Sequence, residues 1–233
     1  RDSVVAVAGS GFQICYKFGQ EPYRLYHNLK VDSNELTCVA ELDGINSACT
    51  NSPANFRTVV DYSEQFGLEG VVIGDGDAVK LVQSTEDCTA AARNRFGGEV
   101  TVIDWTVSLR FTQPGQGFLL CYRFGSVSAG EPFKLYPGFT FDSFEVSGPV
   151  KTVAVKEIPE VVVFQGLGMA DGDTAKWVPK GQDCTYTPSV SLGGEQSVSA
   201  GSATFTFTET GAYNQLCYKF GTEPWVQYPG IKI

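Results

Sequence analysis

The sequence LCYKFGTEPW occupies residues 216–225, and two further copies of it occur in the same chain of 233 residues. One copy reads ICYKFGQEPY at residues 14–23, and the other reads LCYRFGSVSAGEPF at residues 120–133, with four extra residues before its Glu-Pro. Repeated segments of this kind decide the fold, because every copy is expected to adopt the same local structure.

A second repeated block precedes two of these copies. It reads GDGDAVKLVQSTEDC at residues 74–88 and ADGDTAKWVPKGQDC at residues 170–184. In both cases 33 positions separate the closing cysteine from the cysteine of the CY(K/R)FG motif. The chain therefore has the pattern of the back end of one module followed by two whole modules, each of about 80 to 95 residues, a common domain size.

Strand patterns dominate these modules. Residues 203–210, ATFTFTET, and residues 100–112, VTVIDWTVSLRFT, alternate β-branched or aromatic residues with others, whereas a helical period is rare. A single helical turn is expected at residues 90–94. Within the CY(K/R)FG motif the alternate apolar residues share one strand face, which predicts the core face, and the Gly and Pro that follow predict a β-hairpin.

The run FTETGAYNQLCYKFG at residues 207–221 places a Gly and a Tyr ahead of a Cys, on a strand that a hairpin follows. In this respect it resembles the F and G strands of immunoglobulin-like modules. The resemblance covers both whole modules and implies an all-β fold of tandem Ig-like antiparallel β-sandwich modules with disulfides. One departure is that Tyr213 lies four positions before Cys217, whereas a tyrosine corner has its Tyr two before, and the matching residue of the middle module is Gly117.

The predicted organisation has four parts. They are the C-terminal part of a truncated Ig-like module at 1–36, a disulfide-containing connector at 37–54, and Ig-like modules at 55–148 and 149–233. The truncated first part leads to a further expectation, in which a neighbouring segment or subunit supplies the missing strands. Such an exchange would complete a sandwich across a junction and propagate a filament.

Seven cysteines with a single histidine and no CxxC spacing predict disulfides rather than a zinc site, and an extracellular or cell-surface location. The recurring spacing and the local loop between the first two modules predict three pairs: Cys88 with Cys121, Cys184 with Cys217, and Cys38 with Cys49. Cys15 is then unpaired or paired outside the chain, and other pairings among Cys15, Cys38 and Cys49 remain open. Alternation places Cys217 on the outer face of its strand, away from the core.

The net charge of −9 and the pI near 4.6 argue against nucleic acid as a partner, and the apolar runs are too short for a membrane span. Catalysis is not expected, because a Ser/His/Asp or Cys/His mechanism would have to use His27, and that residue has the setting of a turn residue. No cofactor is predicted, except that Ca²⁺ is a candidate. Its ligands would be the paired aspartates of the two DGD sequences, Asp75, Asp77, Asp171 and Asp173, and the alternative is a tight turn capped by its own side chains.

The sequence thus predicts a structural repeat segment of an extracellular or cell-surface protein, used as a filament or surface-layer scaffold in contact with other copies of itself or with neighbouring modules. The alternative is an adhesin or receptor ectodomain that binds a glycan or a protein. Divergent, exposed loops in one module only would favour that alternative, and residues 126–130 and 38–49 are the places to look. Trp177 and Trp225 are expected in the core rather than as sugar platforms.

Overall fold

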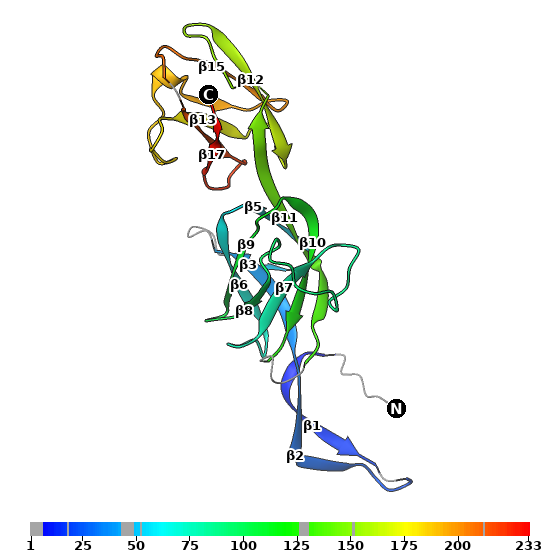
Figure 1. Ribbon diagram of the computed structural model, residues 1–233. Coiled ribbons are helices and arrows are strands. Elements are labelled where there is room, and N and C mark those ends of the chain that lie inside the picture. The colour runs from blue at the N-terminus through cyan, green and yellow to red at the C-terminus, as the bar shows by residue number, and fades with distance from the viewer. Residues whose placement is uncertain are drawn as a thin grey trace. The chain divides into compact units, whose positions relative to one another are not determined.

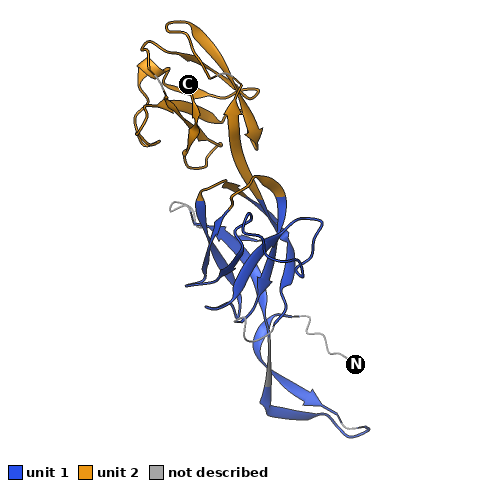
Figure 2. Cartoon of the chain, in the orientation of Figure 1, with its two compact units in different colours: residues 1–56, 63–110, 117–141 blue, residues 57–62, 111–116, 142–233 orange. Residues whose placement is uncertain are grey.

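The computed structural model describes residues 7–17, 19–42, 49–51, 53–125, 131–150, 152–211 and 213–233. Antiparallel strands make up nearly all of its regular structure (Figure 1). The chain divides into unit 1, residues 1–56, 63–110 and 117–141, and unit 2, residues 57–62, 111–116 and 142–233 (Figure 2). Two segments, residues 126–130 and residues 38–49, are the expected places for a binding loop. All of the first segment and residues 43–48 of the second lie outside the described residues.

Besides the two-stranded sheet of the N-terminal hairpin, unit 1 contains a four-stranded sheet and part of a seven-stranded one. The four-stranded sheet has the order β4 (Thr50–Asn51), β3 (Glu35–Glu41), β6 (Ser63–Val71), β9 (Thr106–Arg110). The part of the seven-stranded sheet in unit 1 has the order β8 (Glu99–Thr101), β7 (Ala78–Val82), β10 (Gly115–Arg123), β11 (Lys134–Pro149), and β5 (Ala54–Val59) also pairs with β11. Strand β11 gives residues 134–141 to unit 1 and residues 142–149 to unit 2.

Unit 2 repeats this arrangement. The seven-stranded sheet continues from β11 to β12 (Pro159–Leu167) and β15 (Ser202–Thr206), and a four-stranded sheet has the order β14 (Glu195–Ser197), β13 (Thr174–Val178), β16 (Gln215–Lys219), β17 (Val226–Lys232). A 3-10 turn, η2 (Val190–Leu192), is the only helical element among the described residues. The predicted all-β fold of antiparallel sandwich modules with disulfides is confirmed.

The repeated motif forms the core face, as its alternation predicts. Leu216, Tyr218 and Phe220 are each 0% exposed and lie in the core cluster of unit 2, together with Trp177 and Phe205. The ring of Trp177 meets that of Phe205 edge-on at 6.0 Å. Trp177 therefore belongs to the core. Leu120 and Tyr122 are equally buried in unit 1, 1% and 0% exposed.

Two local predictions differ from the structure. Residues 100–112 form two strands rather than one, because Asp104 and Trp105 adopt positive φ, 48° and 59°, and fold the chain back between β8 and β9. Residues 90–94 form no helical turn, because the Ala90 carbonyl accepts a hydrogen bond from the Lys80 ammonium instead of from an amide one turn later.

The first copy of the motif forms a hairpin of β1 (Gly9–Tyr16) and β2 (Arg24–Ser33). Ile14 lies opposite Tyr26 in it, as Leu216 lies opposite Tyr228 in unit 2. His27 lies within β2 and is exposed, so it is a strand residue rather than the predicted turn residue. The predicted module boundaries remain predictions. Strand β3, residues 35–41, crosses the boundary predicted between residues 36 and 37, and it pairs with β6.

Candidate functional site

The most distinctive polar constellation surrounds a buried aspartate at the start of β13. Asp173 is 1% exposed, and its Oδ2 accepts hydrogen bonds from the Tyr218 hydroxyl and the Ala170 amide, both at 2.9 Å. Its Oδ1 accepts one from the Gly221 amide at 2.8 Å. A single carboxylate thus ties the loop before β13 to the end of β16 and to the hairpin that follows it. Hydrogen bonds to a charged acceptor are stronger than neutral ones, so this carboxylate fixes the end of the sandwich.

Unit 1 contains the same constellation. Asp77 is 4% exposed and accepts hydrogen bonds from the Tyr122 hydroxyl and from the amides of Gly74 and Gly125. The tyrosine that follows the motif cysteine, rather than the residue four positions before it, therefore carries the buried hydroxyl in both units. This explains why the DGD sequences and the CY(K/R)FG motif recur together.

The first aspartate of each DGD sequence has a different role. Asp75 Oδ1 accepts a hydrogen bond from the Asp104 amide, and Asp171 Oδ1 accepts one from the Ala200 amide, each at 2.7 Å. Both carboxylates are exposed, and they cap the turn between β8 and β9 in unit 1 and the turn between β14 and β15 in unit 2. Two explanations were open for the recurrence of Asp75, Asp77, Asp171 and Asp173, a Ca²⁺ site and a turn capped by side chains. The hydrogen bonds of these four aspartates are those of the second explanation.

Among the described residues, one set of three potential metal-ligand atoms lies within 4.8 Å of one another, and it belongs to Cys38, Cys49 and Glu69. The two sulfurs of that set are joined as a disulfide. Disulfide sulfurs are not thiolates, so this set does not offer the ligands that a metal ion requires.

The structure contains three disulfides, Cys38–Cys49, Cys88–Cys121 and Cys184–Cys217, and Cys15 is an exposed free thiol. Cys217 is fully buried, yet it lies outside the main core of unit 2. It packs with Cys184 and Val178, against Tyr186 and Trp225, in a small second cluster. The bond thus fastens the loop after β13 to the outer face of β16.

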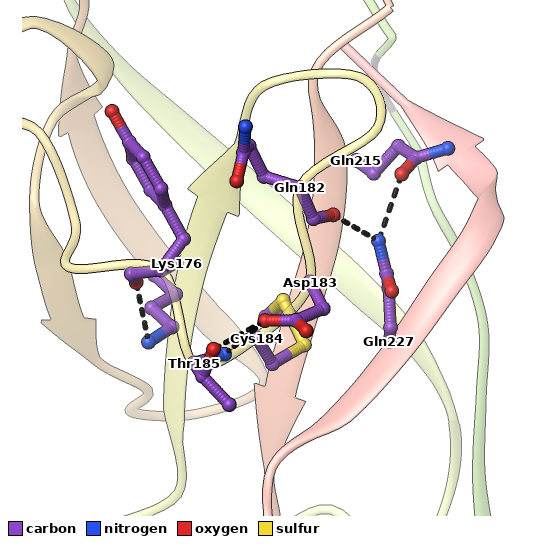
Figure 3. Close-up of a disulfide and its surroundings, with 9 residues drawn as sticks. Lys176, Gln182, Asp183, Cys184, Thr185, Gln215 and Gln227 are labelled. Atoms are coloured by element: carbon purple, nitrogen blue, oxygen red, sulfur yellow. Dashed lines mark hydrogen bonds between the residues drawn. A yellow bond between two sulfur atoms is a disulfide. The ribbon is translucent and has the colours of Figure 1, made fainter.

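Polar contacts hold that loop around the disulfide (Figure 3). The Asp183 carboxylate accepts hydrogen bonds from the Thr185 amide and hydroxyl, and these lower the pKa of Asp183. The Lys176 ammonium donates to the Tyr186 carbonyl at 3.2 Å. Its nitrogen also lies 4.4 Å from the ring centre of Trp225. Trp225 is therefore a half-buried cover for the lysine, and not a free platform.

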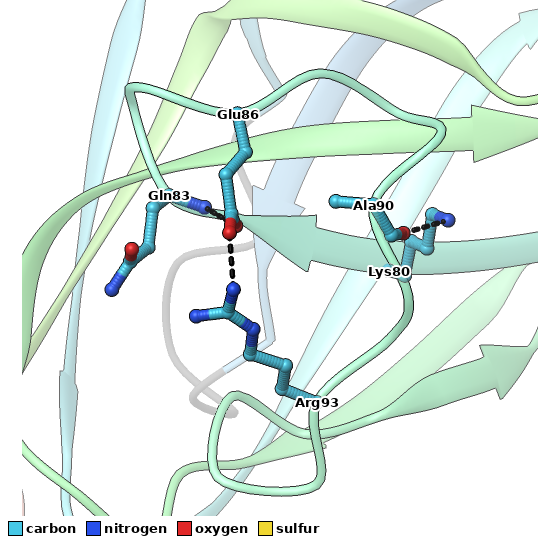
Figure 4. Close-up of polar contacts among 5 residues, drawn as sticks. All are labelled: Lys80, Gln83, Glu86, Ala90 and Arg93. Carbon is cyan, nitrogen blue, oxygen red and sulfur yellow. Dashed lines mark hydrogen bonds and ion pairs between the residues drawn. The ribbon is translucent and has the colours of Figure 1, made fainter.

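The corresponding loop of unit 1 is held in a similar way (Figure 4). The Lys80 ammonium donates to the Ala90 carbonyl at 2.7 Å. Its nitrogen also lies 4.4 Å from the ring centre of Phe133. Glu86 forms an ion pair with Arg93 in the same loop. Burial lowers the pKa of Lys80, as it does that of Lys176, although acidic neighbours act in the opposite direction.

The buried tyrosines give unit 2 a pH dependence. Burial, and then the hydrogen bond and charge of Asp173, raise the pKa of Tyr218 far above its usual value of 10.0. Burial also raises the pKa of Tyr228 to about 12. Because an unfolded tyrosine ionises near pH 10 while these stay protonated, their contribution to stability is complete below pH 10 and is lost as the pH rises above it, by about 1.4 kcal/mol per pH unit for each tyrosine.

We therefore expect the free-energy difference between the native chain and Tyr218→Phe to shrink between pH 8 and pH 11, by about 1.4 kcal/mol. The comparison isolates one tyrosine, because the lowered pKa of Lys176 changes stability in the opposite direction but is common to both proteins. Urea unfolding at the two pH values measures the difference. A constant difference would contradict the expectation.

Two exposed aromatic residues occupy backbone positions where the other module has glycine. Trp105, with φ 59° and 64% exposed, stands where unit 2 has Gly201, and Tyr213, with φ 69° and 59% exposed, stands where unit 1 has Gly117. A large residue at positive φ costs on the order of 1 kcal/mol or more. Neither aromatic was singled out from the sequence as a functional residue, but aligning the two modules would have revealed both exchanges of glycine for an aromatic.

The backbone strain can be measured directly. We expect Tyr213→Gly and Trp105→Gly each to raise the free energy of unfolding, by about 1 kcal/mol, because glycine adopts positive φ without strain. The matched change Gly117→Ala, at φ 68°, should lower it by a similar amount. A loss of stability in both aromatic variants would show that these rings contribute packing that outweighs the strain.

These observations define a class of protein, an all-β chain of tandem antiparallel sandwich modules closed by disulfides. No family model matches the chain, and no curated protein matches it. Among solved structures the chain is similar to the FN1–FN3 domains of chicken CNTN1, with 10% sequence identity and a TM-score of 0.29. The similarity covers 86% of this chain and 66% of that one, and a likeness this weak carries no argument about function.

Proposed function

We propose that this chain is a structural repeat segment of an extracellular or cell-surface protein, a scaffold built from tandem sandwich modules and working without catalysis. Three disulfides are typical of proteins that fold in an oxidising environment. Of the described residues, none belongs to a helix long and apolar enough to cross a membrane.

The observation that carries the proposal is the continuity of β11. This strand of 16 residues belongs to unit 1 over residues 134–141 and to unit 2 over residues 142–149, so no linker residues separate the two units. Domains that move independently are usually joined by exposed Pro/Gly-rich or polar linkers. A shared strand fits a chain whose modules serve as mechanical elements.

Imaging of the native particle by electron microscopy tests the scaffold. We expect filaments or a surface lattice with a spacing that matches one or two modules. Insertion of a flexible Gly/Ser linker between Phe141 and Asp142 should disorder that spacing, whereas the same insertion in the loop at residues 180–181 should leave it unchanged. Native particles without any repeat would overturn the proposal.

A second candidate function, recognition of a saccharide, is favoured by Trp105. Trp105 lines an open pocket of about 440 Å³ together with Asp75 and Asp104, and both of these acidic residues are exposed. Carboxylates accept hydrogen bonds from vicinal hydroxyl groups, and an exposed indole offers an apolar face for a sugar ring. Unit 2 has Ala200 and Gly201 at the two turn positions, so the feature belongs to one module only.

A glycan array probed with the labelled chain tests this second function. We expect a subset of neutral oligosaccharides to bind, and Trp105→Ala to abolish their signal, while Tyr213→Ala leaves it intact. Binding of an arginine-rich peptide, with no oligosaccharide bound, would assign the pocket to a cationic partner instead. Equal signals from the native chain and Trp105→Ala would exclude the saccharide site.

A further inference from the structure

The hairpin of β1 and β2 carries the same motif as β10 with β11 and β16 with β17, but it is far more exposed. Tyr16 is 53% exposed, whereas its counterparts Tyr122 and Tyr218 are 0% exposed. Tyr23 is 71% exposed and Leu29 is 51% exposed. Among the described residues the sheet of β1 and β2 has two strands and no third. Two-stranded hairpins are marginally stable in water, so this one needs a cover.

The two complete modules show what covers such a hairpin. In unit 2 the core face of β16 packs on residues of β12, β13 and β15, and the ring of Tyr218 lies 5.5 Å from that of Phe164 on β12. We call these preceding strands, with the loops between them, the front half of a module. In both complete modules the front half also supplies the cysteine that bonds to the motif cysteine.

Cys15 is the motif cysteine of the first copy, in line with Cys121 and Cys217. It is exposed and free, whereas those two are fully buried and bonded. In the complete modules one partner, the front half, both covers the apolar face of the motif and bonds to its cysteine. The exposed apolar face and the free thiol of the first copy therefore require a partner of that kind. That partner is a sheet edge and apolar face with a cysteine that follows an aspartate, as in Asp87-Cys88 and Asp183-Cys184.

We propose that the β1–β2 hairpin docks onto the front half of a further module of this repeat class, carried by a polypeptide segment outside residues 1–233, and that Cys15 forms a disulfide with the Asp-Cys cysteine of that segment. The biological use of this docking, the joining of scaffold segments, rests on the proposed function. The docking itself rests on the repeat alone.

Disulfide formation needs an oxidant, for which a small-molecule disulfide such as oxidised glutathione suffices. The Cys15 thiolate attacks one sulfur of that disulfide and releases the other as a thiol, which gives a mixed disulfide. The partner's thiolate then attacks Cys15 Sγ and releases the second thiol. Two protein thiols are thereby oxidised, one small disulfide is reduced to two thiols, and the two thiol protons end on the released molecules.

Two fusions, each an insertion into the full chain, test the docking. In the first, a copy of residues 142–210 is inserted between Ala8 and Gly9, so that the added copy of Cys184 precedes Cys15 by the same spacing that separates Cys184 from Cys217 in unit 2. In the second, a copy of residues 35–114 is placed there, which restores the spacing of unit 1. After folding with oxidised and reduced glutathione, free thiols are titrated, disulfides are mapped by mass spectrometry, and hydrogen exchange is measured for the amides of β1 and β2.

The unfused chain should show one reactive thiol, and each fusion should show none, with Cys15 bonded to the added copy of Cys184 or Cys88. Hydrogen exchange in β1 and β2 should slow at least tenfold. In a control, serine replaces the added cysteine, and the hairpin amides should stay protected while the Cys15 thiol returns. If Cys15 stays reactive and the hairpin amides stay unprotected in both fusions, the docking is overturned.

This result is separable from the scaffold proposal. Protected hairpins in the fusions, together with native particles that lack any repeat, would retain the docking and reject the scaffold. Native particles with a regular repeat, together with unprotected hairpins in both fusions, would retain the scaffold and reject the docking.

Discussion

Replacing Asp173 with alanine is expected to lower the free energy of unfolding of unit 2 by about 3 to 5 kcal/mol. The carboxylate accepts from the Tyr218 hydroxyl and from two backbone amides in a place where water is excluded. Each buried donor left without an acceptor costs about 1 to 3 kcal/mol, so the loss exceeds that of one ordinary hydrogen bond. A loss of this size is a large share of the total stability of a small domain.

Urea unfolding followed by the fluorescence of the buried Trp177 measures this loss. Asp171→Ala is the matched control, because the exposed Asp171 carboxylate caps a single amide and its removal should cost about 1 kcal/mol or less. Asp77→Ala should destabilise unit 1 as Asp173→Ala destabilises unit 2. Equal losses from Asp173→Ala and Asp171→Ala would contradict the role assigned to the buried carboxylate.

Removing the disulfide of unit 2 by the double change Cys184→Ser and Cys217→Ser should lower its stability by about 3 to 4 kcal/mol. The bond closes a separation of 33 residues, and the entropy that it removes from the unfolded chain grows with that length. The same change at Cys88 and Cys121, also separated by 33 residues, should have a similar effect on unit 1.

The third disulfide provides an internal comparison. Cys38 and Cys49 are separated by 11 residues, so the chain-entropy term is smaller by about 1 kcal/mol. Thermal unfolding of the three double variants under identical conditions gives the order of their effects. A larger loss from the Cys38 and Cys49 variant than from either of the others would show that native packing, and not loop entropy, sets the contribution of these bonds.

Much of the fold could be predicted because its determinants are local or repeated. Alternation within residues 216–220 identified the core face, and the spacing from Cys184 to Cys217 identified a bond that the structure contains. The link between Asp173 and Tyr218 joins residues 45 positions apart, and no local pattern shows which donors will meet a given carboxylate. The aspartates could therefore be recognised as important while their partners could not.

The remaining differences have conformational causes. Alternation continues through Asp104 and Trp105, and only their positive φ values reveal the reversal of the chain between β8 and β9. Tryptophan is a poor residue for that backbone region, so sequence reasoning favours an uninterrupted strand. Likewise, Ala90 is a good helix former, but a lysine ammonium donates to its carbonyl, and residues 90–94 form no helical turn.

The absence of linker residues within β11 has a consequence for the chain under tension. When force is applied between Asn34 and the C-terminus, no slack can be drawn out between residues 141 and 142, so the first event in a force–extension trace should be the rupture of a module. The bond between Cys184 and Cys217 then shields the 33-residue segment that it closes, which withholds roughly 110 Å of contour length at about 3.4 Å per residue. Reducing agent should lengthen the rupture step of unit 2 by that amount.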